Sequence, residues 1–121
     1  MENQNITNGY NANPCNNSLL AVEDALYIIG GKWKLRIIIA LKRRDQRFNG
    51  LLRTLPGISA RVLSNELKEL EVSGFIQKTI DPNSPLVSRY VLTEYSRTLK
   101  EVLKSLSDWG IMHRRKLKQE C

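Results

Sequence analysis

The sequence has few of the residues from which catalytic and metal sites are built. It contains a single histidine, His113, and two cysteines, Cys15 and Cys121, which lie near opposite ends of the chain. Without a second histidine or a CxxC pair, the chain lacks the spacing of a zinc site and the side chains of a nucleophile–base pair. The sequence therefore predicts a protein that is not an enzyme and that holds no metal and no cofactor.

Long hydrophobic runs are also missing. The longest uninterrupted apolar run, residues 37–41, is far shorter than the ~20 residues that a membrane-spanning helix needs. The N-terminus lacks the basic start and apolar stretch of a secretory signal. We therefore expect a cytoplasmic protein with no membrane partner.

Basic residues are absent from the first part of the chain and dense in the next. Residues 1–31 hold three acids and no Lys or Arg, whereas residues 32–61 hold nine basic residues and one acid. The whole chain has a net charge of +7 and a pI near 9.7. A concentrated basic block of this kind is the electrostatic footprint expected of a protein that binds DNA phosphates.

Residues 47–78, within and just after this block, predict two short helices around a turn, followed by a strand. Leucines at helical spacing mark the two helices: Leu51, Leu52 and Leu55 on the first, and Leu63, Leu67 and Leu70 on the second. Pro56-Gly57 interrupts the pattern, Ser59 can cap the second helix, and Gly74 can end it. This is a helix-turn-helix, whose second helix can enter the major groove of DNA.

The polar face of the second helix carries side chains suited to reading DNA. Arg and Lys meet phosphates or guanine edges, and Asn pairs well with adenine. Considered alone, this segment also fits a solvated face in an ordinary helical bundle. The residues predicted to contact DNA, including those of the hairpin described next, are Arg47, Asn49, Ser59, Ala60, Arg61, Ser64, Asn65, Lys68, Lys78 and Arg89.

The hydrophobic period changes after Gly74. Residues 75–80 and 87–92 alternate like strands, and residues 81–85 between them are turn formers. A β-hairpin directly after a helix-turn-helix makes a winged helix, with Lys78 and Arg89 as the basic residues of the wing. The predicted fold is mainly α with a small β-hairpin.

The ends of the chain complete this prediction. Residues 1–17 are rich in Asn and predict a mobile arm, and residues 18–121 form one winged helix-turn-helix domain. Its first helices span residues 18–29, capped by Ser18, and residues 32–43, and a last long helix opens at Thr93.

The last helix carries a longer apolar stripe than a core of this size is expected to cover, and the first helix also presents a long apolar stripe. Excess apolar helix surface usually marks an interface, and the alternative is that the last helix folds back on its own core. A two-fold homodimer would place two reading helices on one face of a palindromic operator. The predicted dimerisation residues are Leu19, Val22, Leu26, Leu99, Val102, Leu103, Leu106 and Trp109.

Several short strings within residues 22–110 point together to one family. They are Ile29-Gly30-Gly31-Lys32-Trp33, Arg47-Phe48, Leu55-Pro56-Gly57-Ile58-Ser59, Leu67-Lys68-Glu69-Leu70-Glu71, Gly74-Phe75-Ile76, Leu92-Thr93 and Trp109-Gly110. The sequence resembles the HxlR-type winged-helix transcriptional regulators, relatives of the MarR-like regulators. The resemblance implies a bacterial, dimeric, DNA-binding regulator, here predicted to be a repressor. It also implies that the helix after Ser59 reads the major groove and that the terminal helices dimerise.

The chain departs from the family pattern in two places that bear on function. The family often has Arg-Val-Glu-Tyr before the Leu-Thr pair, where this chain has Val87-Ser88-Arg89-Tyr90. Many members carry a cysteine about ten residues before the Gly-Gly pair, where this chain has Leu20.

Control by oxidants, electrophiles or a small molecule is expected, with Cys15 and Cys121 as candidate redox-sensing residues. The alternative is that both thiols stay reduced in the cytoplasm and have no regulatory role. The alternative function is a winged helix that docks proteins without binding specific DNA.

Overall fold

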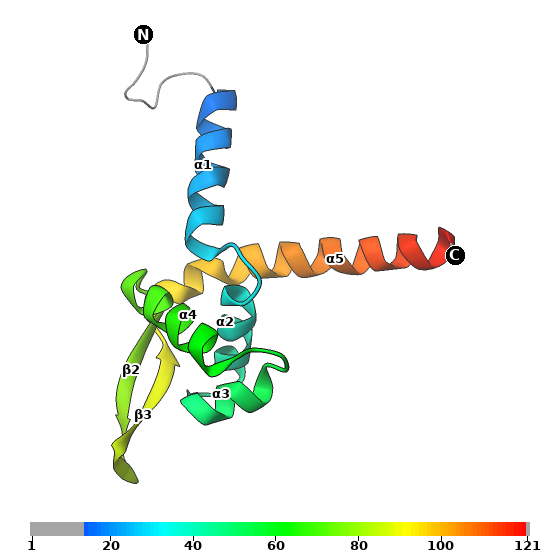
Figure 1. Cartoon of the computed structure of the whole chain (residues 1–121). Helices are drawn as coiled ribbons and strands as arrows, with labels where there is room; N and C mark the ends of the chain where they lie inside the picture. Colours follow the sequence, from blue (N-terminus) through cyan, green and yellow to red (C-terminus); the bar gives the residue numbers. More distant parts are fainter. Residues whose placement is uncertain (1–13, 121) are drawn as a thin grey trace. The chain divides into compact units, whose positions relative to one another are not determined.

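The computed structural model describes residues 14–120, and the side chains of residues 17–119. The chain divides into two compact units, residues 1–34 and residues 35–121, and each is described by itself. In chain order the elements are α1 (Pro14–Ile29), α2 (Lys34–Arg43), β1 (Gln46–Arg47), α3 (Phe48–Thr54), α4 (Ala60–Val72), β2 (Ile76–Asp81), β3 (Ser84–Leu92), the 3-10 helix η1 (Glu94–Leu99) and α5 (Lys100–Glu120) (Figure 1).

Helix α1 begins earlier than the sequence predicted. It starts at Pro14, so Ser18 lies inside the helix and the prediction that it caps the N-terminus is wrong. Pro is well suited to a first helical position, because its fixed φ matches the helix and its missing N–H would have no partner there. Residues 14–17 of the predicted mobile arm are therefore helical, and residues 1–13 lie outside the described residues.

Helices α2, α3 and α4 supply most of the hydrophobic core of residues 35–121. Leu63, Leu67 and Leu70 are all at most 2% exposed, so the predicted buried face of α4 is confirmed. Each such side chain contributes about 1.5–3 kcal/mol by leaving water. The other buried apolar residues are Ile37, Ile38, Ala40, Leu41, Leu51, Leu55, Ile58, Phe75, Ile76, Tyr90 and Leu99.

The turn between α3 and α4 and the two ends of α4 have the expected local chemistry. The Ser59 side chain accepts a hydrogen bond from the Val62 backbone N–H at 3.1 Å, as a helix N-cap does. Gly57 in the turn and Gly74 after α4 have φ values of +92° and +88°, which side chains other than glycine rarely adopt. The predicted helix-turn-helix is confirmed.

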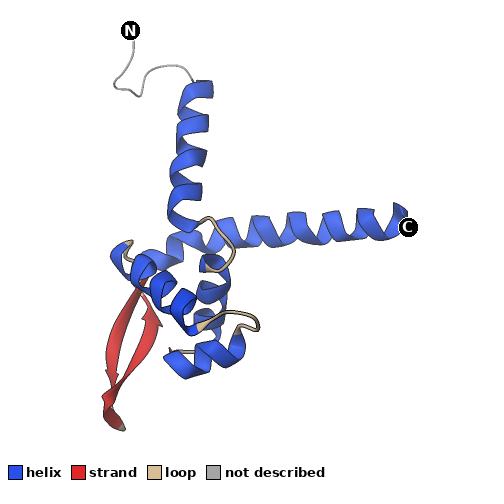
Figure 2. Cartoon of the chain, in the orientation of Figure 1, coloured by secondary structure: helices blue, strands red, loops and turns tan. Residues whose placement is uncertain are grey.

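The strands form a three-stranded antiparallel sheet in the order β1-β3-β2, of which the β2–β3 hairpin is the red ribbon in Figure 2. The sequence did not predict β1, because two residues are too few to show an alternating pattern. The predicted loop 81–85 was too long, since Asp81 pairs with Ser84 across a turn at residues 82–83. The register then steps to Ile80 opposite Ser88, so residues 85–87 bulge out of β3.

The base of the hairpin is joined to the end of α4. Thr93 Oγ1 donates a hydrogen bond to the Gly74 carbonyl oxygen at 2.5 Å, and the rings of Phe75 and Tyr95 stack with centroids 5.0 Å apart. The chain then continues as η1 and α5, rather than as one α-helix from Thr93. In Figure 1 the β2–β3 hairpin and α5 leave the group formed by α2, α3 and α4 in different directions. Among the described residues, no helix is long and apolar enough to cross a membrane.

Candidate nucleic-acid interface

The outer face of α4 presents polar and basic side chains to solvent. Arg61, Asn65 and Lys68 are exposed, whereas Ser64 is only partly so. Ser59 and Ala60, at the start of the helix, are also exposed. This face is opposite the buried leucines, so the core fixes the orientation of α4 while leaving the predicted reading residues accessible.

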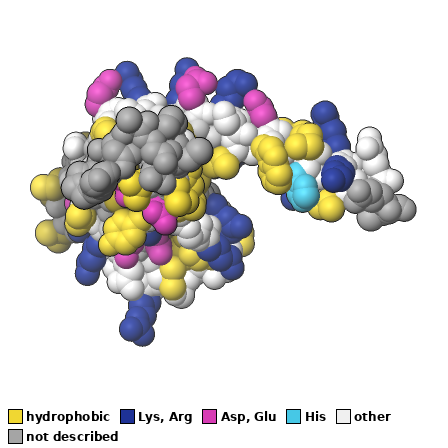
Figure 3. All heavy atoms as spheres, turned by 90° about the horizontal axis from the view of Figure 1, so that it is seen from above, with side chains coloured by type: hydrophobic (Ala, Val, Ile, Leu, Met, Phe, Trp, Pro, Cys, Tyr) yellow, Lys and Arg dark blue, Asp and Glu magenta, His cyan; other side chains and the backbone are white. Residues whose placement is uncertain are grey.

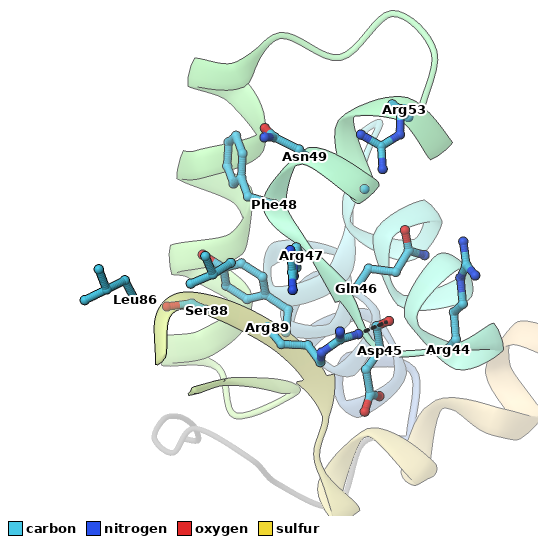
Figure 4. Close-up of a pocket in the computed structure, with 13 residues that line it drawn as sticks. Arg44, Asp45, Gln46, Arg47, Phe48, Asn49, Arg53, Leu86, Ser88 and Arg89 are labelled. Carbon is cyan, nitrogen blue, oxygen red and sulfur yellow. Dashed lines mark hydrogen bonds between the residues drawn. The ribbon is translucent and has the colours of Figure 1, made fainter. Parts of the chain in front are cut away.

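A second basic surface lies between the start of α3 and strand β3. Its centre is a groove of about 620 Å³, and Figure 4 shows the side chains that line it. The groove brings together three residues that the sequence predicted as DNA contacts: Arg47, Asn49 and Arg89. Arg44 and Arg53 line the same groove and were missed. Both belong to the basic block of residues 32–61, but charge counting alone could not show which of its members share a surface.

One carboxylate holds two of the four arginines that line this groove. Asp81, at the end of β2, is 1% exposed. Its Oδ2 accepts from Arg47 Nε at 2.8 Å and lies 2.6 Å from Arg47 Nη2, and it also accepts from Arg89 Nη2 at 3.1 Å. A hydrogen bond from the Asn83 backbone N–H, together with these two guanidinium groups, lowers the pKa of Asp81 from 3.8 to about 2. Asp81 is therefore ionised at any pH at which DNA binding would be studied.

The two arginines remain partly available to solvent. The side chains of Arg47 and Arg89 are 43% and 34% exposed. Arg89 Nη1 also donates to the Asp45 carbonyl oxygen at 3.1 Å, which is drawn as a dashed line in Figure 4. A guanidinium has five N–H donors, so each arginine can hold Asp81 and still face the groove.

Buried Gln46 joins the end of α3 to α2. Its Nε2 donates to the Ala40 carbonyl oxygen at 3.2 Å, and its Oε1 accepts from Thr54 Oγ1 at 3.0 Å. Gly50 leaves room for this side chain, since a Cβ there would lie 3.2 Å from Gln46 Oε1. Sequence reasoning gave Gln46 no role, because a lone glutamine carries no pattern.

The wing carries one further predicted contact. Lys78 is exposed on β2, and its Nζ lies 5.9 Å from the centroid of the Tyr90 ring, its partner across the strands. This cation–π contact helps to orient the lysine without removing it from solvent. Leu86, in the bulge near the tip, is fully exposed.

The last helix exposes most of its predicted apolar stripe. Val102, Leu106 and Trp109 are 41%, 52% and 59% exposed, and Leu103 is partly exposed. Hydrophobic side chains are visible along α5 in Figure 3. Leu99 differs, because it is 7% exposed and belongs to the core at the junction of η1 and α5. It therefore has little surface to offer to a partner.

The first helix exposes its predicted stripe as well. Leu19, Val22 and Leu26 are each more than half exposed. Cys15 lies in α1, but its side chain is outside the described ones, as is the whole of Cys121. Among the described residues, no group of His, Cys, Asp and Glu has the composition of a metal site.

A winged helix with an exposed basic and polar face on α4 has close counterparts among known proteins. Residues 28–118 match the model of the HxlR-like helix-turn-helix family. The chain belongs to this family. It is 39% identical over 95 residues to an HTH-type transcriptional regulator of Methanothermobacter thermautotrophicus, covering 78% of this chain and 72% of that one. The protein-docking alternative is not favoured, and this HxlR-like protein is a DNA-binding transcriptional regulator.

Solved structures agree with the assignment. The redox regulator HypR in its reduced form superposes with a TM-score of 0.73 at 34% identity, covering 82% of this chain and 98% of that one. The reduced form of the transcriptional regulator YodB from Bacillus subtilis gives a TM-score of 0.67 at 31% identity, covering 74% and 88%. The winged helix-turn-helix fold predicted from the sequence is confirmed.

Proposed function

We propose that this HxlR-like regulator is a homodimer that represses transcription by binding a palindromic operator in the cytoplasm. The observation that carries the proposal is the division of α4 into two faces. One face is buried through Leu63, Leu67 and Leu70, and the other exposes Arg61, Asn65 and Lys68. A helix held rigidly with such a face outward can enter a major groove and read base edges.

The DNA backbone would run along the arginine-lined groove between the start of α3 and β3. Phosphate contacts fix the register of a protein on DNA, while base contacts give specificity. Arg44, Arg47, Arg53 and Arg89 line this groove, and together they give it the charge and the guanidinium donors that phosphates bind best. Lys78 on the wing would extend the contact toward the neighbouring minor groove.

Dimerisation through the terminal helices would double this surface. The exposed side chains of Val102, Leu106 and Trp109 lie on one stripe of α5, and water contact with such a stripe is unfavourable. A second copy of the chain is the partner that a two-fold operator requires. With reading helices ~34–36 Å apart, the half-sites would lie one helical turn apart.

The proposal can be tested without knowing the operator. Duplexes of about 30 base pairs with random centres, long enough for two half-sites one turn apart, would be selected by repeated binding to the purified protein. We expect enrichment of an inverted repeat and a complex with two protein chains per duplex. Enrichment of an asymmetric site, or light scattering that gives a monomer at micromolar concentration, would contradict the proposal.

We also propose control by thiol oxidation, because both HypR and YodB were solved in forms described as reduced. The candidate thiols are Cys15 and Cys121. Oxidation that joins them between subunits would pull on the dimer helices and change the spacing of the two α4 helices. Diamide treatment should then give a dimer on a non-reducing gel and a changed DNA mobility shift. Cys15→Ser should abolish both effects, and a response equal to that of the wild type would exclude this switch.

A further inference from the structure

Asp81 is unusual for a residue at the tip of an exposed hairpin. It directly precedes the turn at residues 82–83, yet its side chain is 1% exposed. Buried carboxylates are rare unless they are paired. Here the Arg47 and Arg89 guanidinium groups donate to Asp81 Oδ2. The Asn83 backbone N–H donates to Asp81 Oδ1 at 2.9 Å.

These bonds connect Asp81 to all three strands of the sheet. Asp81 is the last residue of β2, Arg89 lies on β3, and Arg47 is the last residue of β1. Arg47 is also the residue that precedes α3. The base of the hairpin is held to the end of α4, but β1 pairs with β3 through only Gln46 and Arg47, so the backbone offers the far end of the hairpin little restraint against the helix-turn-helix. The Asp81 carboxylate supplies a direct link between the far end of the hairpin and the start of α3.

We propose that Asp81 is a positioning residue for DNA binding, which orients the wing and presents Arg47 and Arg89 to the DNA backbone. The proposal rests on the contact of the wing and the arginine-lined groove with DNA proposed above. Asp81 touches no DNA itself. It acts by holding the Arg47 and Arg89 side chains in one geometry, so that DNA binding does not have to bear the conformational entropy cost of ordering them.

A positioning role for Asp81 and simple electrostatics predict opposite changes in DNA affinity when the Asp81 charge is removed. An acid on a DNA-binding surface repels phosphates, so removing its charge should strengthen binding if charge is all that matters. If Asp81 positions the wing, Asp81→Asn should weaken binding by about tenfold, the scale of one lost hydrogen bond to a charged group. The matched control is Asp45→Asn, which removes an exposed acid beside the same groove. It should leave binding unchanged or tighten it by up to about fivefold.

The experiment measures affinity at several salt concentrations on two duplexes of about 30 base pairs, one selected by the wild-type protein and one of mixed sequence. Loss of positioned phosphate contacts should lower the magnitude of the salt slope by about one to two for Asp81→Asn. A loss of folded protein alone would leave that slope unchanged. Asp81→Glu keeps the charge but moves the carboxylate, so it should also weaken binding and lower the slope.

Hydrogen exchange provides a readout that does not involve DNA. Asp81→Asn should speed exchange of the Asn83 amide and of the amides that join β1 to β3, whereas Asp45→Asn should leave them unchanged. Binding by Asp81→Asn that equals or exceeds that of the wild type would overturn the proposal. So would loss of the folded state in both Asp81 variants, since Asp81 would then support the fold as a whole.

A further variant separates this proposal from the proposed wing contact. Lys78→Ala removes a wing cation that lies over the Tyr90 ring and is not one of the three groups described above as bonded to Asp81. If Lys78→Ala weakens binding but Asp81→Asn does not, only the positioning role is refuted. If neither variant changes affinity or salt slope, the proposed contact of the wing with DNA is refuted as well.

Discussion

Arg61→Ala should weaken DNA binding while leaving the stability of the fold unchanged, and it therefore tests the role of the exposed face of α4. Arg61 lies in the first turn of α4, where base contacts concentrate, and its side chain is exposed. Truncating an exposed side chain usually changes the free energy of unfolding by no more than about 0.5 kcal/mol. If Arg61 reads a guanine, the same change should weaken specific binding by about 1–3 kcal/mol, which is roughly 5- to 150-fold.

The opposite face of the same helix gives the reverse expectation. Leu67 is 2% exposed, and Leu→Ala at such a site costs about 2–5 kcal/mol of stability. Below its melting transition, the Leu67→Ala protein should still bind the operator with an affinity much closer to that of the wild type than Arg61→Ala does. Arg97→Ala is the charge control, because it removes an exposed arginine from η1, away from the α4 face.

The assay is fluorescence anisotropy with the selected duplex and with variants changed at single base pairs, alongside thermal melts of each protein. Arg61→Ala should lose discrimination at one position of each half-site. Equal weakening on every sequence would show that Arg61 meets only phosphate. A folded Arg61→Ala protein with the affinity of the Arg97→Ala control would refute the assignment of α4 as the reading helix.

Three further predictions concern the dimer, pH and the end of α4. Trp109→Lys should give a monomer by light scattering and lose operator affinity. The control is Ser107→Lys, which lies about 160° around the helix from Trp109 and should remain dimeric. A dimeric Trp109→Lys protein would argue against the α5 interface. The pKa of Asp81 is lowered from 3.8 to about 2, so its contribution to stability should be full above pH ~4 and be lost as the pH falls toward 2. The free energy of unfolding of the wild type and of Asp81→Asn should therefore change differently with pH only in that window. Gly74→Ala should lower stability by about 1–2 kcal/mol because φ is +88°; an unchanged melting temperature would contradict this.

The sequence by itself determined the parts of the protein that depend on short-range order. Leucines at helical spacing, Ser59 as a cap and Gly74 as an end are all local signals, and α4 follows them. The helical period also predicted which face of α4 is exposed, because a helix that buries one apolar stripe exposes the opposite face. The family strings added the expectation of a DNA-binding regulator, which the comparisons confirmed.

Only the tertiary structure decided how the second basic surface is assembled. Arg47 and Asp81 are 34 residues apart in the sequence, and no periodicity connects them. Strand β1 exists because β3 pairs with it, and Leu99 is buried because of where η1 meets α5. Such features depend on contacts between distant segments, whose partners are chosen by the packing of the whole domain. The sequence could therefore predict which helix reads DNA, but the carboxylate that joins the hairpin to the residue before α3 became visible only in three dimensions.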